Sequence, residues 1–357
     1  MHKPKQKKIF DHLDYYLEHE ISPVRQNIDN LNQHLQRRGS LYNSIGIPKI
    51  LIEGKSVLEV GPGSGHNSLY VSSCNPMSYD FLEPNEMAWG HIEELYSETS
   101  KKINLVQPRI IKKKLEDFDE YEKYDVVICE GWLGVNENER GLMQKLGGLV
   151  KSKGLLVVTL SSPIGYFSNI IRRILSWNIV NKNKSLSENT NELIHAFGSH
   201  LNTMKDMSRF PEDWVQDTLL SPSIYTLSPT PAMFIEDVGD SFSIYGSYPK
   251  INSDWRWYKS LYGSERRFNE IFLEAYYRNI HNFFDYNLVL DPRDKLLNLS
   301  IEESAFNLIN IAGNRENNSN MVIDDEVKDA INEVFDKLIE INPYWAKPLN
   351  EVSSLIE

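Results

Sequence analysis

The sequence predicts an α/β fold: a mainly parallel sheet with helices on both faces and helical additions at both ends. Three observations predict this fold. Short apolar runs alternate with amphipathic stretches between residues 55 and 161. The first run leads into a glycine-rich turn, and helical periodicity dominates the two flanks. We therefore expect a helical cap over residues 1–50, a cofactor-binding core over 51–250 with an insertion after about 164, and a mainly helical region over 251–357.

Five apolar runs are expected to form the strands of the sheet: residues 56–60, 78–82, 109–113, 124–129 and 154–161. Between them, residues 86–97 and 138–151 have the amphipathic pattern of helices. Strands that alternate with helices form right-handed crossovers, so neighbouring strands are expected to run parallel. Residues 241–248 alternate in polarity and predict one further, returning strand.

The flanks show helical spacing. Val24, Ile28, Leu31 and Leu35 form one apolar stripe, for which Ser22 and Pro23 suit the start. Residues 181–192 are polar and predict a loop. A last amphipathic helix follows Asp324, its expected cap. Periodicity leaves open whether this helix packs on its own domain or on a second subunit of an oligomer.

Composition and charge exclude several classes of protein. A 41 % share of hydrophobic residues with 25 % charged residues is typical of a globular chain, and the net charge of −12 argues against nucleic acid as a partner. Two cysteines are too few for a disulfide framework, and the longest apolar run, residues 154–160, is too short to span a membrane. Because no apolar stretch follows the basic N-terminus, we expect a cytoplasmic protein.

The glycine-rich turn reads Glu59-Val60-Gly61-Pro62-Gly63-Ser64-Gly65. Glycine is needed where a ligand approaches the backbone too closely for a Cβ atom. A helix that follows such a turn presents free N–H groups to a polar ligand. Dinucleotide enzymes place their third glycine where this chain has His66, so the pattern disfavours an NAD enzyme.

Two acidic motifs follow the turn at informative distances. Glu83, followed by Pro84, comes 20 residues after Gly63 at the end of the second predicted strand. A carboxylate at that place has two oxygens with which to accept hydrogen bonds from a ribose diol. Glu116, Asp117 and Phe118 follow the third predicted strand. An acid at this place can accept a hydrogen bond from the amino group of adenine, and the apolar side chain next to it can pack on the adenine ring.

Together with the strands around Cys129 and Leu155, these motifs resemble the class I, Rossmann-like methyltransferases that use S-adenosyl-L-methionine (SAM). The resemblance covers about residues 50–165 and implies a seven-stranded sheet with a reversed last strand. It implies that the turn with Glu59, Gly61, Pro62, Gly63 and Gly65 lies against the amino-acid end of SAM. Glu83 with Pro84 would hold the ribose, and Glu116, Asp117 and Phe118 the adenine. The flanks resemble a poorly characterised bacterial subgroup with a Trp-Arg-Trp-Tyr element, here residues 255–258.

The acceptor of the methyl group is expected beyond the carboxyl ends of the strands. Glu130 follows the fourth strand there, where it can accept a proton, contact the cofactor's amino group or cap the loop. Trp132 either walls the site or belongs to the core. His66 is either a catalytic base or a partner of the backbone.

Further side chains are candidates for holding the acceptor. Arg37, Arg38 and Tyr42 precede the core, and an arginine fork suits an anionic acceptor, although a solvated helix end explains the same residues. The aromatic element at 255–258 either stacks on a sugar or base or, as we favour, packs half-buried. The nine histidines show no metal-ligand spacing, so we expect no metal.

We expect methyl transfer from SAM to an oxygen or nitrogen of a small molecule, such as a sugar or glycan precursor. The alternatives are a methyltransferase acting on protein or RNA, and a non-catalytic SAM-binding subunit. The intact glycine turn and Glu83 favour a functional cofactor site over a degenerate one.

Overall fold

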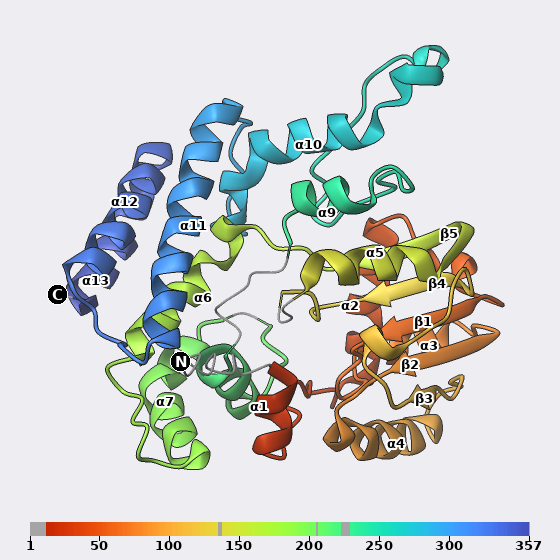
Figure 1. Cartoon of the computed structure of the whole chain (residues 1–357), viewed down its shortest axis with the longest axis horizontal. Coiled ribbons are helices and arrows are strands. Elements are labelled where there is room, and N and C mark those ends of the chain that lie inside the picture. The colour runs from red at the N-terminus through yellow and green to blue at the C-terminus, as the bar shows by residue number, and fades with distance from the viewer. Residues whose placement is uncertain (1–11, 135–137, 205, 223–228, 357) are drawn as a thin grey trace, which may run out of the picture.

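The computed structural model describes residues 12–134, 138–204, 206–222 and 229–356 (Figure 1). Its centre is a parallel five-stranded sheet in the order β3-β2-β1-β4-β5. The chain order reverses between β1 and β4, and in open parallel sheets a ligand crevice forms at that reversal. The strands are β1 (Ser56–Val60), β2 (Ser78–Leu82), β3 (Arg109–Ile111), β4 (Tyr124–Cys129) and β5 (Val150–Val158). The α/β fold with a Rossmann-like parallel sheet is therefore confirmed.

Helices cover both faces of the sheet. On one face, Val57, Phe81 and Ile128 pack against α2 (Leu31–Ser44), α3 (Leu69–Ser73) and α4 (Glu86–Ser100). On the other face, Leu58 and Val127 pack against α5 (Glu139–Leu149) and α9 (Pro231–Val238). Because both faces are covered, β1 is buried at every position and β4 at all but Asp125, instead of alternating between buried and exposed residues.

A separate helical layer lies beside the sheet, on the left of Figure 1. It consists of α6 (Pro163–Ser176), α11 (Lys295–Asn317), α12 (Asp325–Ile341) and α13 (Ala346–Ile356), which share one hydrophobic cluster. Asp324 caps α12 as predicted, and the apolar stripe of α12 packs within this layer. The C-terminal helices thus pack on α6, which belongs to the insertion. Among the described residues, no helix combines the length and apolarity needed to span a bilayer.

The described residues also form other helices and short helical turns. They are α1 (His12–Glu18), α7 (Leu186–Leu201), α8 (Pro211–Val215), the π-helical turn η3 (Gln216–Leu220), α10 (Phe268–Asn279), and the short turns η1 (Lys49–Leu51), η2 (Leu115–Asp117), η5 (Tyr258–Ser260), η6 (Gly263–Arg266), η7 (Ile280–Phe283) and η8 (Pro343–Trp345). Helix α7 begins at a capping box formed by Ser185 and Glu188. The loop predicted over residues 181–192 was therefore wrong in its second half.

The N-terminal flank differs from its prediction. Helix α2 begins only at Leu31, capped by Asn30, and it runs on through Gly39. The preceding residues are extended: Gln26 pairs with Arg209 in an antiparallel bridge, and the Asn27 N–H donates to the Ser208 carbonyl at 2.6 Å. The predicted start at Ser22 and Pro23 was therefore wrong, because these long-range partners satisfy the backbone instead, whereas the second half of the stripe, Leu31 and Leu35, does lie in a helix.

The predicted strand over residues 241–248 is also absent, so the described sheet ends at β5 with five strands instead of seven. Instead, the Ile244 N–H donates to Asn269 Oδ1 at 2.8 Å. A Cβ atom on Gly246 would lie 2.2 Å from the Ile45 carbonyl oxygen, so this segment packs closely on the end of α2. Its alternating residues meet helices and not a neighbouring strand.

Candidate functional site

The turn after β1 can be built only from glycine at two positions. Gly61 and Gly63 have φ angles of +66° and +56°, in the left-handed region that side chains disfavour. A Cβ atom on Gly61 would lie 2.7 Å from Trp132 Cδ1, and one on Gly63 would lie 2.6 Å from Val24 Cγ2. The turn is therefore a close-fitting wall, as the sequence pattern predicts.

A Gly63→Ala variant is expected to lose SAM affinity by at least about ten-fold, since backbone strain of about 1–2 kcal/mol adds to the clash with Val24. Titration of the purified protein with SAM measures this loss. Gly54→Ala is the matched control, because Gly54 has a φ of +68° and no atom within 4 Å of the added Cβ. Equal affinities of the two variants would contradict the role of the turn.

Glu83 ties the tip of β2 to this turn. Its Oε2 accepts a hydrogen bond from the Gly63 N–H at 3.0 Å, and its Oε1 accepts one from the Asn85 N–H at 2.9 Å. Burial raises the pKa of Glu83 to about 7, against the lowering effect of these two backbone donors. The carboxyl group is therefore fixed in place beside the glycines.

A cavity of about 150 Å³ opens in front of these residues. Gly61, Gly63 and Glu83 line one side, and Gly131 and Trp132 after β4 line another. Leu115 and Glu116 complete its base. This is the crevice that the strand order predicts between β1 and β4.

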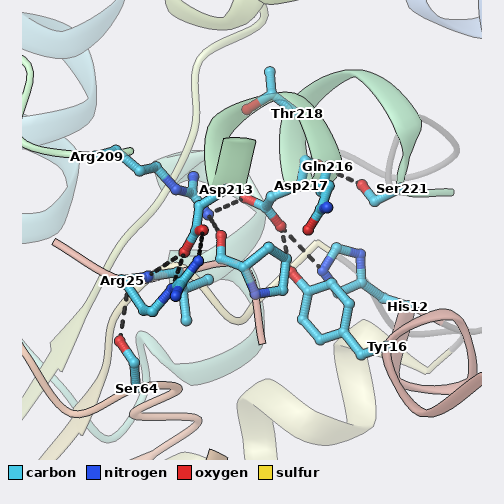
Figure 2. A network of polar contacts seen from close by, with 12 residues as sticks. His12, Tyr16, Arg25, Ser64, Arg209, Asp213, Gln216, Asp217, Thr218 and Ser221 are labelled. Carbon is cyan, nitrogen blue, oxygen red and sulfur yellow. Dashed lines mark hydrogen bonds and ion pairs between the residues drawn. The ribbon is translucent and has the colours of Figure 1, made fainter. Parts of the chain in front are cut away.

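The cavity is covered by two segments that are distant in sequence, α1 and η3. Figure 2 shows His12, Tyr16 and Arg209 converging on Asp217. The Tyr16 hydroxyl donates to Asp217, Arg209 Nη2 donates to Oδ2 at 2.6 Å, and His12 Nε2 lies 3.4 Å from Oδ1. Burial alone would raise the pKa of Asp217, but Arg209 and these neighbours hold it well below its usual value. We call α1 together with residues 209–220 the cover.

A second ion pair holds the extended link that follows α1. Arg25 Nε and Nη2 donate to the two oxygens of Asp213 at 3.1 and 2.6 Å, and its backbone N–H donates to Oδ2 at 2.9 Å. Close by, the Ser64 hydroxyl of the glycine turn donates to the Val24 carbonyl at 3.2 Å. The extended link thus ties residues 209–220 of the cover to the glycine turn (Figure 2).

Glu130, at the end of β4, is bound by two side chains of α2. Arg38 Nη2 lies 2.7 Å from each Glu130 oxygen, and the Tyr42 hydroxyl donates to Oε1 at 2.8 Å. Burial raises the pKa of Tyr42, and the Glu130 charge adds to this. Arg38 Nε is buried and has no partner among the described residues. A donor aimed at no acceptor suits an anionic ligand group at this place.

A second, larger cavity of about 570 Å³ begins at Glu130 and Tyr42. It follows β5 along residues 154–158, on the edge that no further strand covers. Most of its other lining side chains are apolar or aromatic, namely Ile45, Ile47, Phe234, Phe242, Ile244, Tyr245, Tyr248, Ile251, Phe272, Tyr276 and Phe283, and the hydroxyl groups of Thr159, Ser161, Ser162, Ser243 and Ser247 lie among them. Glu130 is the only charged side chain among the described residues that line it. Glu130 lines this cavity and its neighbour Gly131 lines the first, so the two cavities come close to each other at the end of β4.

Several predicted site residues lie outside both cavities. Glu59 is buried behind the turn and accepts a hydrogen bond from the Tyr79 hydroxyl. Gly65 packs on α4, since its Cβ would lie 3.3 Å from Ile92. Phe118 is buried in the core beside α5. Pro62, Asp117 and Arg37 are likewise not among the lining residues, whereas Pro84 lines the first cavity. The roles given to these residues stay predictions.

His66 is held by its surroundings. Its Nδ1 lies 2.9 Å from Ser64 Oγ, and its carbonyl lies 2.9 Å from His34 Nε2. Burial lowers its pKa to about 4, and His34 adds to this. His66 lines neither cavity, so its geometry matches the backbone-bonding alternative better than a catalytic one.

The buried Glu59 predicts a pH dependence of stability. Burial, followed by the charge of Glu130, raises its pKa from 4.5 to about 7. The folded chain then holds a proton that the unfolded chain releases, so the free energy of unfolding falls as pH rises from about 5 to 8. Over this pH range we expect the free energy of unfolding of the wild type, measured with urea, to fall by on the order of 2 kcal/mol more than that of Glu59→Gln. A constant difference between the two proteins would contradict the raised pKa.

Sequence reasoning missed part of the site. His12, Tyr16, Val24 and Asp217 line the first cavity, yet no motif marks them. Asn85 had a readable signal, because it precedes α4 as an N-cap. It also fixes the cover, since its Nδ2 donates to the Ile21 carbonyl at 3.1 Å.

Comparison with known proteins agrees with this geometry. A family model described as a methyltransferase domain matches residues 16–200, just over half of the chain. Over 110 residues the chain is 33 % identical to the probable histone-arginine methyltransferase CARM1 of Oryza sativa subsp. indica, which covers 30 % of this chain and 20 % of that protein. Over 144 residues it is 26 % identical to the ubiquinone biosynthesis O-methyltransferase of Rickettsia bellii (strain OSU 85-389), which covers 40 % of this chain and 51 % of that protein.

The chain therefore spans between a fifth and about half of the length of these curated relatives. Among solved structures, it is similar to magnesium protoporphyrin IX methyltransferase from Synechocystis PCC 6803 with bound SAM, at 18 % identity and a TM-score of 0.31. That similarity covers 41 % of this chain and 74 % of the other. The matched range contains the whole sheet and its glycine turn, so the chain belongs to the class I, SAM-dependent methyltransferase family.

Proposed function

We propose that this chain transfers the methyl group of SAM to an oxygen or nitrogen atom of a small molecule with a largely apolar body. The observation that carries the proposal is the second cavity, a mainly apolar space in which Glu130 is the single charged side chain among the described lining residues and lies next to Gly131 of the first cavity. Its volume of about 570 Å³ lies within the range of small-molecule sites. Its walls suit an apolar ring better than the sugar considered from the sequence.

The residues of the first cavity fit SAM. Gly61 and Gly63 present bare backbone to the cavity, and Glu83 offers carboxylate oxygens to a ribose diol. Arg38 lines neither cavity, but its buried Nε, which has no partner among the described residues, lies beside Glu130 and suits the carboxylate of the methionyl end. SAM supplies an electrophilic methyl group on a sulfonium. At about 150 Å³ the cavity is smaller than typical ligand sites, so we infer that the cover moves outward when SAM enters.

The protein's part in the reaction is then alignment and proton handling. The two cavities lie close together at the end of β4, and this supports an acceptor in the second cavity that faces the methyl group in the first. Glu130 is bound by Arg38 and Tyr42, so its carboxylate has a fixed direction. It can accept a hydrogen bond, and then the proton, from the acceptor hydroxyl or amine.

A Glu130→Gln variant tests this role. The amide keeps the shape and the bond from Tyr42, but it cannot take a proton, so we expect the turnover number to fall about 10²–10⁴-fold. The assay is label transfer from methyl-labelled SAM to apolar fractions of a metabolite extract. SAM affinity, measured by titration, should change little. No label in any small-molecule fraction, with SAM still bound, would refute the small-molecule acceptor and favour a non-catalytic binding subunit.

One observation favours a second candidate. In the structure the Glu130 carboxylate holds a guanidinium, that of Arg38, and one relative is named as a probable histone-arginine methyltransferase. An arginine side chain of a polypeptide is therefore the alternative acceptor. Label in the high-mass fraction of the same extract, and not in small molecules, would establish it.

A further inference from the structure

Residues 250–267 form an arm that projects from the rest of the molecule at the top right of Figure 1. The arm leaves the wall of the second cavity after Tyr248 and returns into α10 at Phe268. It contains the two short turns η5 and η6. The Trp-Arg-Trp-Tyr element of the sequence lies at its centre. We call this segment the aromatic arm.

The rings of the aromatic arm face solvent. Trp255, Trp257, Tyr258 and Tyr262 are between 63 % and 93 % exposed. The packing interpretation of the Trp-Arg-Trp-Tyr element was therefore wrong. Large aromatic side chains usually bury their area, so four exposed rings in eight residues indicate a surface that meets a partner.

The display of these rings is fixed by Arg256. Its Nε donates to Asp254 Oδ1 at 2.9 Å and its Nη2 to Oδ2 at 2.6 Å. The same guanidinium donates to the Glu265 carbonyl and, at 3.4 Å, to the Arg266 carbonyl. It thereby joins the outgoing half of the arm to the returning half. The arm is thus held in a defined conformation by its own hydrogen bonds.

The arm also reverses the charge of the chain. Its five basic side chains and two acidic ones give +3, on a protein whose net charge is −12. Lys259 Nζ lies 5.9 Å from the Trp257 ring centroid and 6.0 Å from that of Tyr258, so cation and rings form one surface. The basic residues are Lys250, Arg256, Lys259, Arg266 and Arg267.

We propose that the aromatic arm docks this chain on the surface of an anionic lipid bilayer. Tryptophan and tyrosine are the side chains that prefer the headgroup layer of a membrane, and lysine and arginine near them are attracted to anionic lipids. A projection with both exposed rings and positive charge can enter that layer. A second copy of the chain, whose net charge is −12, would offer the arm acidic side chains but no headgroup layer for its rings.

Docking would also bring the second cavity to the membrane. Tyr248 and Ile251, at the base of the arm, line this cavity. An apolar acceptor dissolved in the bilayer would then have a short path to Glu130, a consequence that rests on the proposed function. The docking itself does not rest on methyl transfer, so the two are tested separately.

Flotation of the full chain with vesicles is the test. We expect it to float with vesicles of phosphatidylcholine mixed with phosphatidylglycerol, to float less in high salt, and to stay behind with phosphatidylcholine alone. A Trp255→Ser/Trp257→Ser variant should bind about ten-fold more weakly. Its matched control is Tyr286→Ser/Tyr344→Ser, which removes two rings that are 78 % and 90 % exposed but lie outside the arm.

A variant with fewer basic side chains measures the electrostatic contribution to vesicle binding. Lys259→Gln with Arg266→Gln and Arg267→Gln should lose about a hundred-fold in affinity for the anionic vesicles and most of the salt dependence. A chain that binds SAM but does not float with anionic vesicles would overturn the proposal. So would tryptophan and tyrosine variants that float equally well, or an arm-dependent binding to oligonucleotides or to a second copy without any to vesicles.

Discussion

Replacing Glu83 with alanine is expected to weaken SAM binding by at least a hundred-fold. The substitution removes the acceptor proposed for the ribose hydroxyls, and it leaves the Gly63 and Asn85 N–H groups without their present partner. Two charge-assisted hydrogen bonds together contribute about 3 kcal/mol or more, which is about a hundred-fold in affinity. Calorimetric titration with SAM and with S-adenosylhomocysteine measures the effect.

Two further variants make this test specific. Glu83→Gln keeps one carbonyl acceptor and should lose less affinity than Glu83→Ala. Glu86→Ala removes an exposed acid three residues away, in the first turn of α4, and should bind SAM as the wild type does. If Glu83→Ala bound SAM normally while folding correctly, the cofactor would have to lie elsewhere in the crevice.

The largest loss of stability is expected from Glu316→Ala, about 3–5 kcal/mol in the free energy of unfolding. Glu316 Oε1 accepts from Arg173 Nε at 2.8 Å and from Trp177 Nε1 at 2.8 Å, and its Oε2 accepts from Arg173 Nη2 at 2.7 Å. The Arg173 and Glu316 side chains are only 5 % and 8 % exposed. Removing the carboxylate takes away the negative charge that faces the buried Arg173 guanidinium between α6 and α11, which keeps the Thr218 and Ser221 carbonyls as acceptors.

Urea unfolding of three proteins checks this expectation. Arg173→Met combined with Glu316→Ala should recover part of the loss, because no unpaired charge stays buried. Glu98→Ala is the control from the surface, where the pair with Lys101 is exposed to water and contributes little to stability. A small loss in Glu316→Ala would mean that water reaches Arg173.

Local sequence patterns predicted the sheet and the site residues that lie at the ends of its strands. The buried strands are short apolar runs, and the turn after β1 needs glycine at fixed places, so both are visible in neighbouring residues. Glu83 and Glu130 follow from their positions at strand ends. In each of these cases the residues that decide the structure are close together in the chain.

The cover could not be predicted, because its contacts join residues about 200 positions apart. No sequence motif indicates that Tyr16 contacts Asp217. The apolar stripe from Val24 predicted a helix, but Gln26 pairs with Arg209 in a bridge instead. Residues 241–248 do alternate in polarity, but this alternation did not show whether they pack against a strand or against a helix. Side-chain periodicity reports which face is buried and says nothing about the partner.

The cover has a consequence for the order in which the protein matures during synthesis. The sheet is complete once Val158 has left the ribosome, but Asp217 follows 59 residues later. Until then, His12, Tyr16 and Arg25 have none of their distant partners, and the cofactor crevice lacks its outer wall. A nascent chain therefore passes through a stage with a folded sheet and an open crevice, when chaperones have access to surfaces that the finished protein hides.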